Sequence, residues 1–288
     1  MKNKIHFRLR PGINIDSLRG ELADIKVWGF NGAELSIDTV PLIISGRVNQ
    51  SFVDYVQPVL KEYDLSYSAH IGLGLDLRVK HNLQIHIDTL YSSIDICSRL
   101  NLNPLVLHFE QDSGDKEIEN EFIRHHAEAA AYAEERNVAL VLENVEIEHY
   151  KPVINAIKQI NHPNLAMNLD VGHLYLAAKY LGFSFEDAVM DCIPHVRHCH
   201  LHDNTGIFEP MRLENFDLYE TLSRSERIAH GRGDIHLPPL YGDVPIPFVV
   251  DELKRAGYSG IYTCEYSGKM FAPFNTEICN SVRALIEA

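Results

Sequence analysis

Seven acidic or histidine residues recur along the chain of 288 residues at intervals typical of one strand–helix unit. Five of the six intervals between them are 27 to 38 residues long, and the last is 65 residues. Carboxylate and imidazole groups bind divalent cations, and several carboxylates gathered at one point repel each other unless a cation offsets their charge. These residue types therefore predict a metal site, provided that the fold brings them together. The seven residues are Glu34, His70, His108, Glu143, Asp170, His200 and Glu265.

Eight strand-like runs alternate with longer helix-like segments along the sequence. The runs cover residues 5–9, 32–37, 65–71, 104–110, 138–145, 165–171, 196–202 and 260–267. Strands that alternate with helices favour parallel pairing, and eight such units close a (β/α)8 barrel. The competing doubly wound sheet often carries GxGxxG after its first strand, and this sequence has no such motif there. We therefore expect an α/β protein with a single (β/α)8 TIM barrel domain over residues 1–288.

The polar residues fall near the C-terminal ends of these runs. In a (β/α)8 barrel those ends form the mouth that carries the active site, so residues far apart in sequence converge on one ring. Glu143, Asp170 and Glu265 with the imidazole of His200 form a carboxylate-rich set. Such a set suits Mn²⁺, Mg²⁺ or Co²⁺ and can hold Zn²⁺, and the histidines of the third and fourth runs would favour zinc or manganese. We expect one or two divalent ions.

The connection after the seventh run is unusually long. About forty residues separate Asn204 from the helix predicted over PIPFVVDELKRAG, residues 245–257. Loops much longer than about 15 residues in a compact domain are usually functional. We expect either a lid over the site or a contact between subunits of a homo-oligomer.

Composition restricts the partners and the compartment. The formal net charge is −14, and Lys and Arg are scarce near the expected mouth, which argues against nucleic acid and anionic membranes. The five cysteines form no CxxC pair, and no run approaches the roughly 18 apolar residues of a membrane span. We expect a cytoplasmic protein that acts on a small molecule.

Four motifs resemble the metal-binding motifs of the xylose-isomerase-like barrel superfamily. They are LENV (142–145), LDVGH (169–173), HLHD (200–203) and TCEYS (263–267). This superfamily contains sugar isomerases and epimerases, inosose dehydratases and endonuclease IV. The resemblance implies that Glu143, Asp170, His200 and Glu265 are metal ligands, and that His173 contacts the substrate or a second ion.

The resemblance to the sugar-acting members implies isomerisation or epimerisation of a sugar, sugar phosphate or polyol derivative through an enediolate. In the ketose 3-epimerases two metal-bound glutamates move the proton, and here they would be Glu143 and Glu265. Glu34 resembles the second-strand glutamate of these members and is expected to bind substrate. Their substrate-binding arginine lies where this chain has Gly206, and we expect Arg232 to replace it. A dehydratase of the superfamily would begin with the same proton abstraction.

Endonuclease IV, a three-zinc phosphodiesterase, is similar as well and provides an alternative. The two ligands without counterparts are an Asp-x-His before a glycine-rich loop, where this chain has Glu226, Arg227 and Ile228. Asp234 and His236 have the spacing but follow the glycines, so we expect no third zinc site. A barrel that only binds a ligand is a third reading, although all four principal ligands are present. The seven ligands with counterparts here are His70, His108, Glu143, Asp170, His173, His200 and Glu265.

Other histidines are expected to have structural roles. In HCHLHDN, His198 and His202 flank the proposed ligand on the same face of the strand and would support it, with Asp203 ordering the loop. His125 and His126 lie on a helix rich in Glu and Ala and are expected to face solvent.

Overall fold

Eight parallel strands form a closed barrel in the part of the chain that the computed structural model describes, residues 4–9, 16–72 and 74–288. The order around the barrel is β1-β10-β9-β8-β7-β6-β5-β2. This confirms the predicted (β/α)8 architecture, with the first strand paired to the last. The barrel strands are β1 (Lys4–Leu9), β2 (Gly32–Ser36), β5 (Ser66–Ile71), β6 (Leu105–His108), β7 (Leu140–Glu143), β8 (Leu165–Asp170), β9 (Val196–Leu201) and β10 (Ile261–Cys264).

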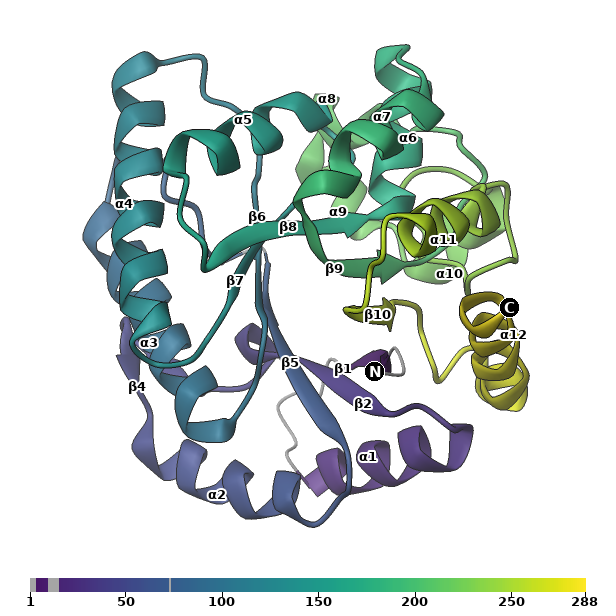
Figure 1. Cartoon of the computed structure of the whole chain (residues 1–288), viewed down its shortest axis with the longest axis horizontal. Coiled ribbons are helices and arrows are strands. Elements are labelled where there is room, and N and C mark those ends of the chain that lie inside the picture. Colours follow the sequence, from purple (N-terminus) through teal and green to yellow (C-terminus); the bar gives the residue numbers. More distant parts are fainter. Residues whose placement is uncertain (1–3, 10–15, 73) are drawn as a thin grey trace.

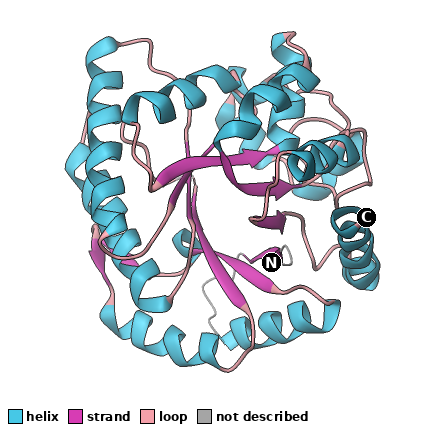
Figure 2. Ribbon diagram, viewed as in Figure 1, coloured by secondary structure: helices cyan, strands magenta, loops and turns pink. Residues whose placement is uncertain are grey.

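Helices enclose the strands, as Figure 1 and the colouring of Figure 2 show. A small antiparallel pair, β3 (Ile43–Ile44) and β4 (Arg47–Val48), lies between the second and third barrel strands. The principal helices are α1 (Asp16–Trp28), α2 (Gln50–Lys61), α3 (Leu83–Leu100), α4 (Lys116–Glu134), α5 (Tyr150–Ile160), α6 (Val171–Leu181), α7 (Phe185–Cys192), α11 (Ile246–Arg255) and α12 (Asn275–Glu287).

The barrel strands alternate between an apolar outer face and a polar inner face. On β1, Phe7 points outward and its ring lies 5.4 Å from Trp28 and 5.0 Å from Tyr266, centroid to centroid. Its neighbours His6 and Arg8 point inward and are buried. Because side chains of a strand alternate with period two, one strand serves both the helix-packed core and the interior.

The interior of the barrel is unusually polar. Many barrels fill this space with layers of branched apolar side chains. Among the described residues of this chain, one small apolar cluster of Val106, Val141 and Ala166 is separate from the main core. The remaining volume holds carboxylates, imidazoles, a guanidinium and hydroxyls that are nearly inaccessible to solvent. Such groups are costly to bury without partners, so their contacts define the site.

The long connection after β9 is folded rather than irregular. It contains three short helices, α8 (Met211–Glu214), α9 (Phe216–Thr221) and α10 (Arg224–His230). Asp203 attaches the segment to the barrel, because its Oδ1 accepts hydrogen bonds from the backbone N–H groups of Asn204 (2.8 Å) and Val244 (3.0 Å). The backbones of Asp203 and Leu237 also pair as a β-bridge. These contacts agree with the loop-ordering role expected for Asp203.

The prediction for His125 and His126 is wrong, because both residues are buried. They lie on the buried face of α4 with Phe122 and three alanines. His126 Nδ1 donates a hydrogen bond to the carbonyl of Phe122 at 2.8 Å. The many glutamates of this helix obscure a face of small and aromatic residues with helical spacing.

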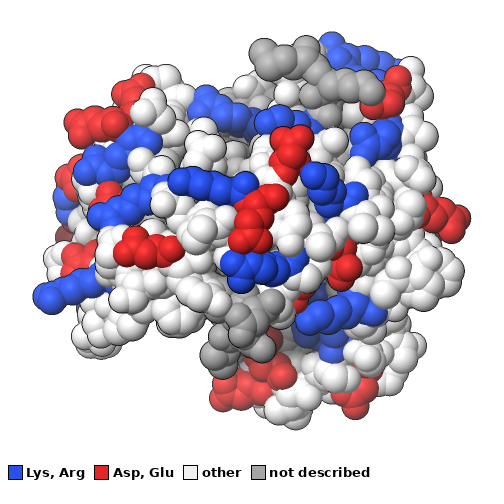
Figure 3. Space-filling view, turned by 90° about the horizontal axis from the view of Figure 1, so that it is seen from below, with Lys and Arg blue, Asp and Glu red and all other residues white. Residues whose placement is uncertain are grey.

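The outer surface carries charges of both signs. On the face shown in Figure 3, Lys and Arg are interspersed with Asp and Glu. Among the described residues, no helix is long and apolar enough to cross a bilayer.

Candidate metal centre

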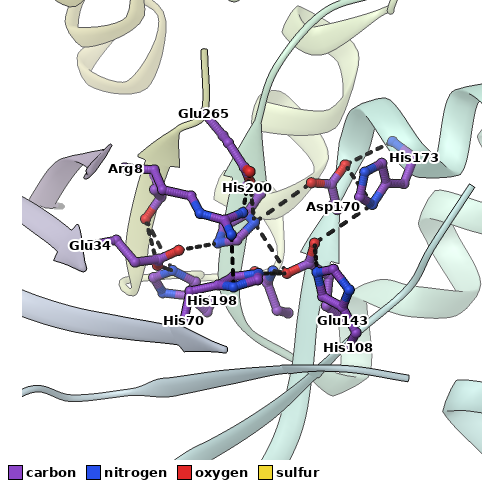
Figure 4. A network of polar contacts seen from close by, with 12 residues as sticks. Arg8, Glu34, His70, His108, Glu143, Asp170, His173, His198, His200 and Glu265 are labelled. Carbon is purple, nitrogen blue, oxygen red and sulfur yellow. Dashed lines mark hydrogen bonds and ion pairs between the residues drawn. The ribbon is translucent and has the colours of Figure 1, made fainter. Parts of the chain in front are cut away.

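Four side chains from neighbouring strands converge at the C-terminal mouth of the barrel. Glu143, Asp170 and His200 lie at the ends of β7, β8 and β9, and Glu265 follows β10. His200 Nδ1 lies 3.0 Å from Glu265 Oε2, 3.3 Å from Glu143 Oε2 and 3.6 Å from Asp170 Oδ2. One ligand atom from each of the four lies within 4.8 Å of the others (Figure 4). The structure thus brings together the four predicted ligands.

The environment of His200 suits a cation at this point. Its Nε2 lies 2.9 Å from Glu34 Oε1, which favours a proton on Nε2 and leaves a lone pair on Nδ1. That lone pair faces carboxylate oxygens, and Glu143 Oε1 and Asp170 Oδ2 are buried without a hydrogen-bond donor. A divalent ion would satisfy these acceptors together. The donor set therefore fits a metal.

When no ion is bound, the pKa values of His200 and Glu143 also favour a positive charge next to ionised carboxylates. Burial lowers the pKa of His200, but Glu34 and Glu143 outweigh it and raise that pKa well above its ordinary value. Burial likewise opposes ionisation of Glu143, yet His200 and His70 hold its pKa well below the usual range. A proton on the imidazole can therefore replace the cation, so protons and metal compete for this site.

Glu34 lies in the middle of β2, not at its end as the sequence suggested. Its carboxylate is fully buried and accepts hydrogen bonds from His198 Nε2 (2.8 Å) and Ser68 Oγ (3.1 Å). Its other oxygen faces His200. Glu34 therefore orients two imidazoles from inside the barrel and does not border the cavity, which differs from the expected contact with substrate.

Arg8 is a site residue that the sequence analysis missed. Its guanidinium forms an ion pair with Glu265 and donates hydrogen bonds to His70 Nδ1 (2.8 Å) and Ser36 Oγ (3.2 Å). The signal in the sequence was the inward register of the first strand, where IHFRL alternates polar and apolar residues.

His70 and His108 lie beside Glu143, but their hydrogen bonds differ. His70 accepts from Arg8 at Nδ1, and its Nε2 contacts Glu143 Oε2 at 3.2 Å, so both ring nitrogens are engaged. Burial and Arg8 lower the pKa of His70 to about 4. His108 Nδ1 contacts Glu110 at 3.1 Å, and its ring borders the cavity. In this arrangement His70 has no free lone pair for a second ion.

A second cluster lies next to the first and corrects one prediction. Asp234 and His236 were excluded as metal ligands because they follow the glycines, but they converge with His173 and His202. His173 Nδ1 and His236 Nδ1 lie 3.1 and 2.9 Å from backbone carbonyls, so each donates its proton there. The Nε2 lone pairs then face Asp234 Oδ2 at 3.4 and 2.7 Å. Acceptors that face each other need a shared cation or additional protons.

His202 reaches this cluster because Gly172 has no side chain. A Cβ atom on Gly172 would lie 2.2 Å from the His202 ring. His202 Nε2 lies 2.9 Å from Asp170 Oδ1 and 3.9 Å from Asp234 Oδ1, between the two clusters. The glycine of LDVGH thus allows the third histidine of HCHLHDN to approach α6.

A cavity of about 310 Å³ opens above both clusters. Arg232 is exposed and does not border this cavity, contrary to the expectation that it contacts substrate. Arginines are nevertheless present at the mouth, so the expected scarcity of cations there is wrong. The arginines that line the cavity are Arg8, Arg212, Arg224 and Arg227.

Fold and site together define an eight-stranded α/β barrel whose C-terminal mouth holds two buried carboxylate–imidazole clusters under a small cavity. The family model described as xylose isomerase-like TIM barrel matches residues 22–285. The chain therefore belongs to the xylose isomerase-like TIM barrel family, as the four motifs predicted. No sequence among the curated proteins matches it significantly.

Solved structures share this fold at low sequence identity. A xylose isomerase-like TIM barrel protein from Mycobacterium smegmatis, in complex with magnesium, has a TM-score of 0.74 and 16% identity, over 99% of this chain and 98% of that one. D-psicose 3-epimerase from Clostridium cellulolyticum H10, with D-tagatose, has a TM-score of 0.72 and 12% identity, over 99% of this chain and 100% of that one. The probable 3-DHS dehydratase of petrobactin synthesis from Bacillus anthracis has a TM-score of 0.70 and 15% identity, over 98% of each chain. At these identities the likeness establishes the fold.

Proposed function

We propose that this protein is a divalent-metal-dependent isomerase or epimerase that acts on a sugar, sugar phosphate or polyol derivative through an enediolate. The observation that carries the proposal is the convergence of three carboxylates on His200 Nδ1, at 3.0 to 3.6 Å, below a small cavity. Family membership supports it, since epimerases are among the structural neighbours.

Glu143 and Glu265 are the proposed proton-transfer groups. A divalent ion held by Glu143, Asp170, His200 and Glu265 would polarise a substrate carbonyl and acidify the adjacent C–H or O–H bond. Both glutamates have pKa values held well below the usual range despite burial: His200 acts on Glu143, and Arg8 on Glu265. Each is thus a carboxylate at neutral pH, the form that accepts a proton. Glu265 borders the cavity, and Glu143 lies beneath it.

Solvent hydrogen exchange tests this reaction class directly. A panel of ketoses, aldoses and their phosphates is incubated in D₂O with protein loaded with Mn²⁺, Mg²⁺, Co²⁺ or Zn²⁺, and the products are followed by NMR. An enediolate reaction transfers deuterium to the carbon that loses its proton. Absence of both isomer formation and deuterium incorporation with every ion would contradict the proposal, and loss of water from the substrate would indicate a dehydratase instead.

Two substitutions test the proton-transfer groups. Glu143→Gln and Glu265→Gln should each reduce kcat at least 10³-fold, because an amide cannot accept the proton. Glu220→Gln is the matched control, since Glu220 is an exposed glutamate at the cavity mouth that contacts neither cluster. Full activity in both site variants would disprove the assignment.

We infer that a second ion, if bound, occupies the cluster of His173, His202, Asp234 and His236. Three imidazoles and one carboxylate suit the tetrahedral geometry preferred by zinc. The acceptors that face each other around Asp234 support this position over one at His70, whose nitrogens are engaged by Arg8 and Glu143.

Metal-dependent phosphodiester cleavage is the second candidate function. The observation that favours it is the position of Asp234 and His236 beside His173. The sequence had argued against these two residues as zinc ligands because they follow the glycines. The engagement of His70 by Arg8 and the net charge of −14 argue against it. Cleavage of abasic-site DNA by the zinc-loaded protein, without deuterium exchange into any sugar, would favour this function.

A further inference from the structure

Two arginines of α10 face the cavity without an acidic partner. Arg224 and Arg227 are three residues apart, so they lie on the same side of the helix, and both line the cavity. Among the described residues, no Asp or Glu oxygen lies within 4.0 Å of either guanidinium. The acidic residue of the same helix, Glu226, forms the capping box with Ser223 instead.

The other arginines of the cavity are neutralised. Arg8 forms its ion pair with Glu265, and Arg212 donates to Glu146 Oε1 at 2.8 Å. Among the arginines that line the cavity, Arg224 and Arg227 are therefore the two without an acidic group within ion-pair distance in the described part of the chain.

Arg227 also has an unused donor. Its Nε is shielded from solvent and has no hydrogen-bond partner, while its guanidinium carbon lies 4.8 Å from the centre of the Tyr219 ring. A buried donor without an acceptor is costly, and the cost is removed when a ligand supplies the acceptor.

We propose that the ligand of this cavity carries an anionic group, a phosphate ester or a carboxylate, bound by Arg224 and Arg227. The planar guanidinium groups match the oxygens of either anion. The polyol end of the same molecule would reach the carboxylate–imidazole centre, and this part of the inference rests on the proposed function. Neutral sugars would then be poorer ligands than sugar phosphates or sugar acids.

The test measures anion binding separately from turnover. Metal-loaded wild type and the double variant Arg224→Gln/Arg227→Gln are titrated with inorganic phosphate and with acetate at constant ionic strength, by calorimetry and thermal shift. We expect the double variant to lose at least tenfold in affinity for one of these anions. Any direct binding of the anion to the metal is common to both proteins, so the difference reports the arginines. Preference for phosphate or for acetate identifies the ester or the carboxylate.

Ribulose 5-phosphate, ribonate and ribulose extend the comparison to whole ligands. The anionic member should bind at least tenfold more tightly than ribulose to wild type, and the double variant should lose this preference while its affinity for ribulose stays unchanged. Arg232→Gln removes a charge from the same segment away from the cavity and should bind like wild type. Equal anion affinity in wild type and double variant would overturn the inference. Anion binding that depends on the arginines, without deuterium exchange in any sugar, would overturn the proposed function alone.

Discussion

At the scale of single residues, the most informative contact joins Glu34 to His200. The sequence analysis assigned both residues to the site, but with different roles: His200 as a metal ligand and Glu34 as a substrate contact. The contact of 2.9 Å from Glu34 to Nε2 leaves Nδ1 directed at the carboxylates. Glu34 thus selects which nitrogen of the imidazole is available.

Replacement of Glu34 by Gln should weaken metal binding by about 10- to 100-fold, the usual effect of losing such a supporting carboxylate. The fold should be retained, because Gln has nearly the same size and can still accept from Ser68. Competition with a chromophoric chelator measures the affinity, with Glu220→Gln as the control. Unchanged affinity in Glu34→Gln would show that the contact does not orient the ligand.

The second cluster leads to a prediction about stoichiometry. Asp234→Asn and His236→Gln should each reduce the zinc content from two ions per chain to one, because each removes a ligand of the second position only. Mass spectrometry of dialysed protein gives the content, and anomalous diffraction at the zinc edge gives the positions. One ion per chain in wild type at zinc saturation would exclude the second position.

At the scale of elements, the sequence predicted the barrel strands and which strand ends carry the site. It did not predict that the connection after β9 folds back to the barrel mouth. Glu143, Asp170 and His200 lie at the C-terminal ends of strand-like runs, and parallel strands place these ends together, so local pattern predicted this part of the site. Asp234 and His236 reach the site through a connection that no strand periodicity describes. Their position depends on the bonds of Asp203 to a segment forty residues later.

Asp203→Ala should therefore loosen the whole segment between β9 and α11. The substitution leaves the N–H groups of Asn204 and Val244 without their acceptor, and we expect it to cost about 2 kcal/mol of stability. Hydrogen exchange over residues 205–245 should accelerate, together with loss of the second ion. Asp243→Ala, an exposed aspartate of the same segment, is the control. Unchanged exchange in Asp203→Ala would show that the short helices hold the segment without this carboxylate.

At the scale of the whole molecule, the sequence predicted a barrel with polar strand ends but not an interior with so many buried imidazoles. Burial lowers the pKa of His126 to about 4, and that of His6 to about 3. The unfolded chain takes up protons at these residues near pH 6.5, whereas the folded protein does not until lower pH. Their contribution to stability is thus fully present above pH 6.5 and is lost as the pH falls toward about 4 for His126 and about 3 for His6.

His126→Gln should make the protein less sensitive to acid. Between pH 6.5 and about 4, one such histidine lowers the free energy of unfolding by up to about 1.4 kcal/mol per pH unit. Urea unfolding of wild type and variant at pH 7.5, 6 and 5 measures the slopes, and the other titrating groups are common to both proteins. We expect a smaller slope in the variant, and identical slopes would contradict this account of His126.

The pairing of β1 with β10 brings Arg8 to Glu265, two residues separated by 257 positions. During synthesis on the ribosome β1 emerges long before β10, so this ion pair and the third carboxylate of the centre, Glu265, come together only after β10 has been translated. Earlier strands can pair locally, but the chain cannot complete its ligand set. Capture of the proposed metal would therefore follow synthesis of β10, and a chain terminated before β10 would be inert.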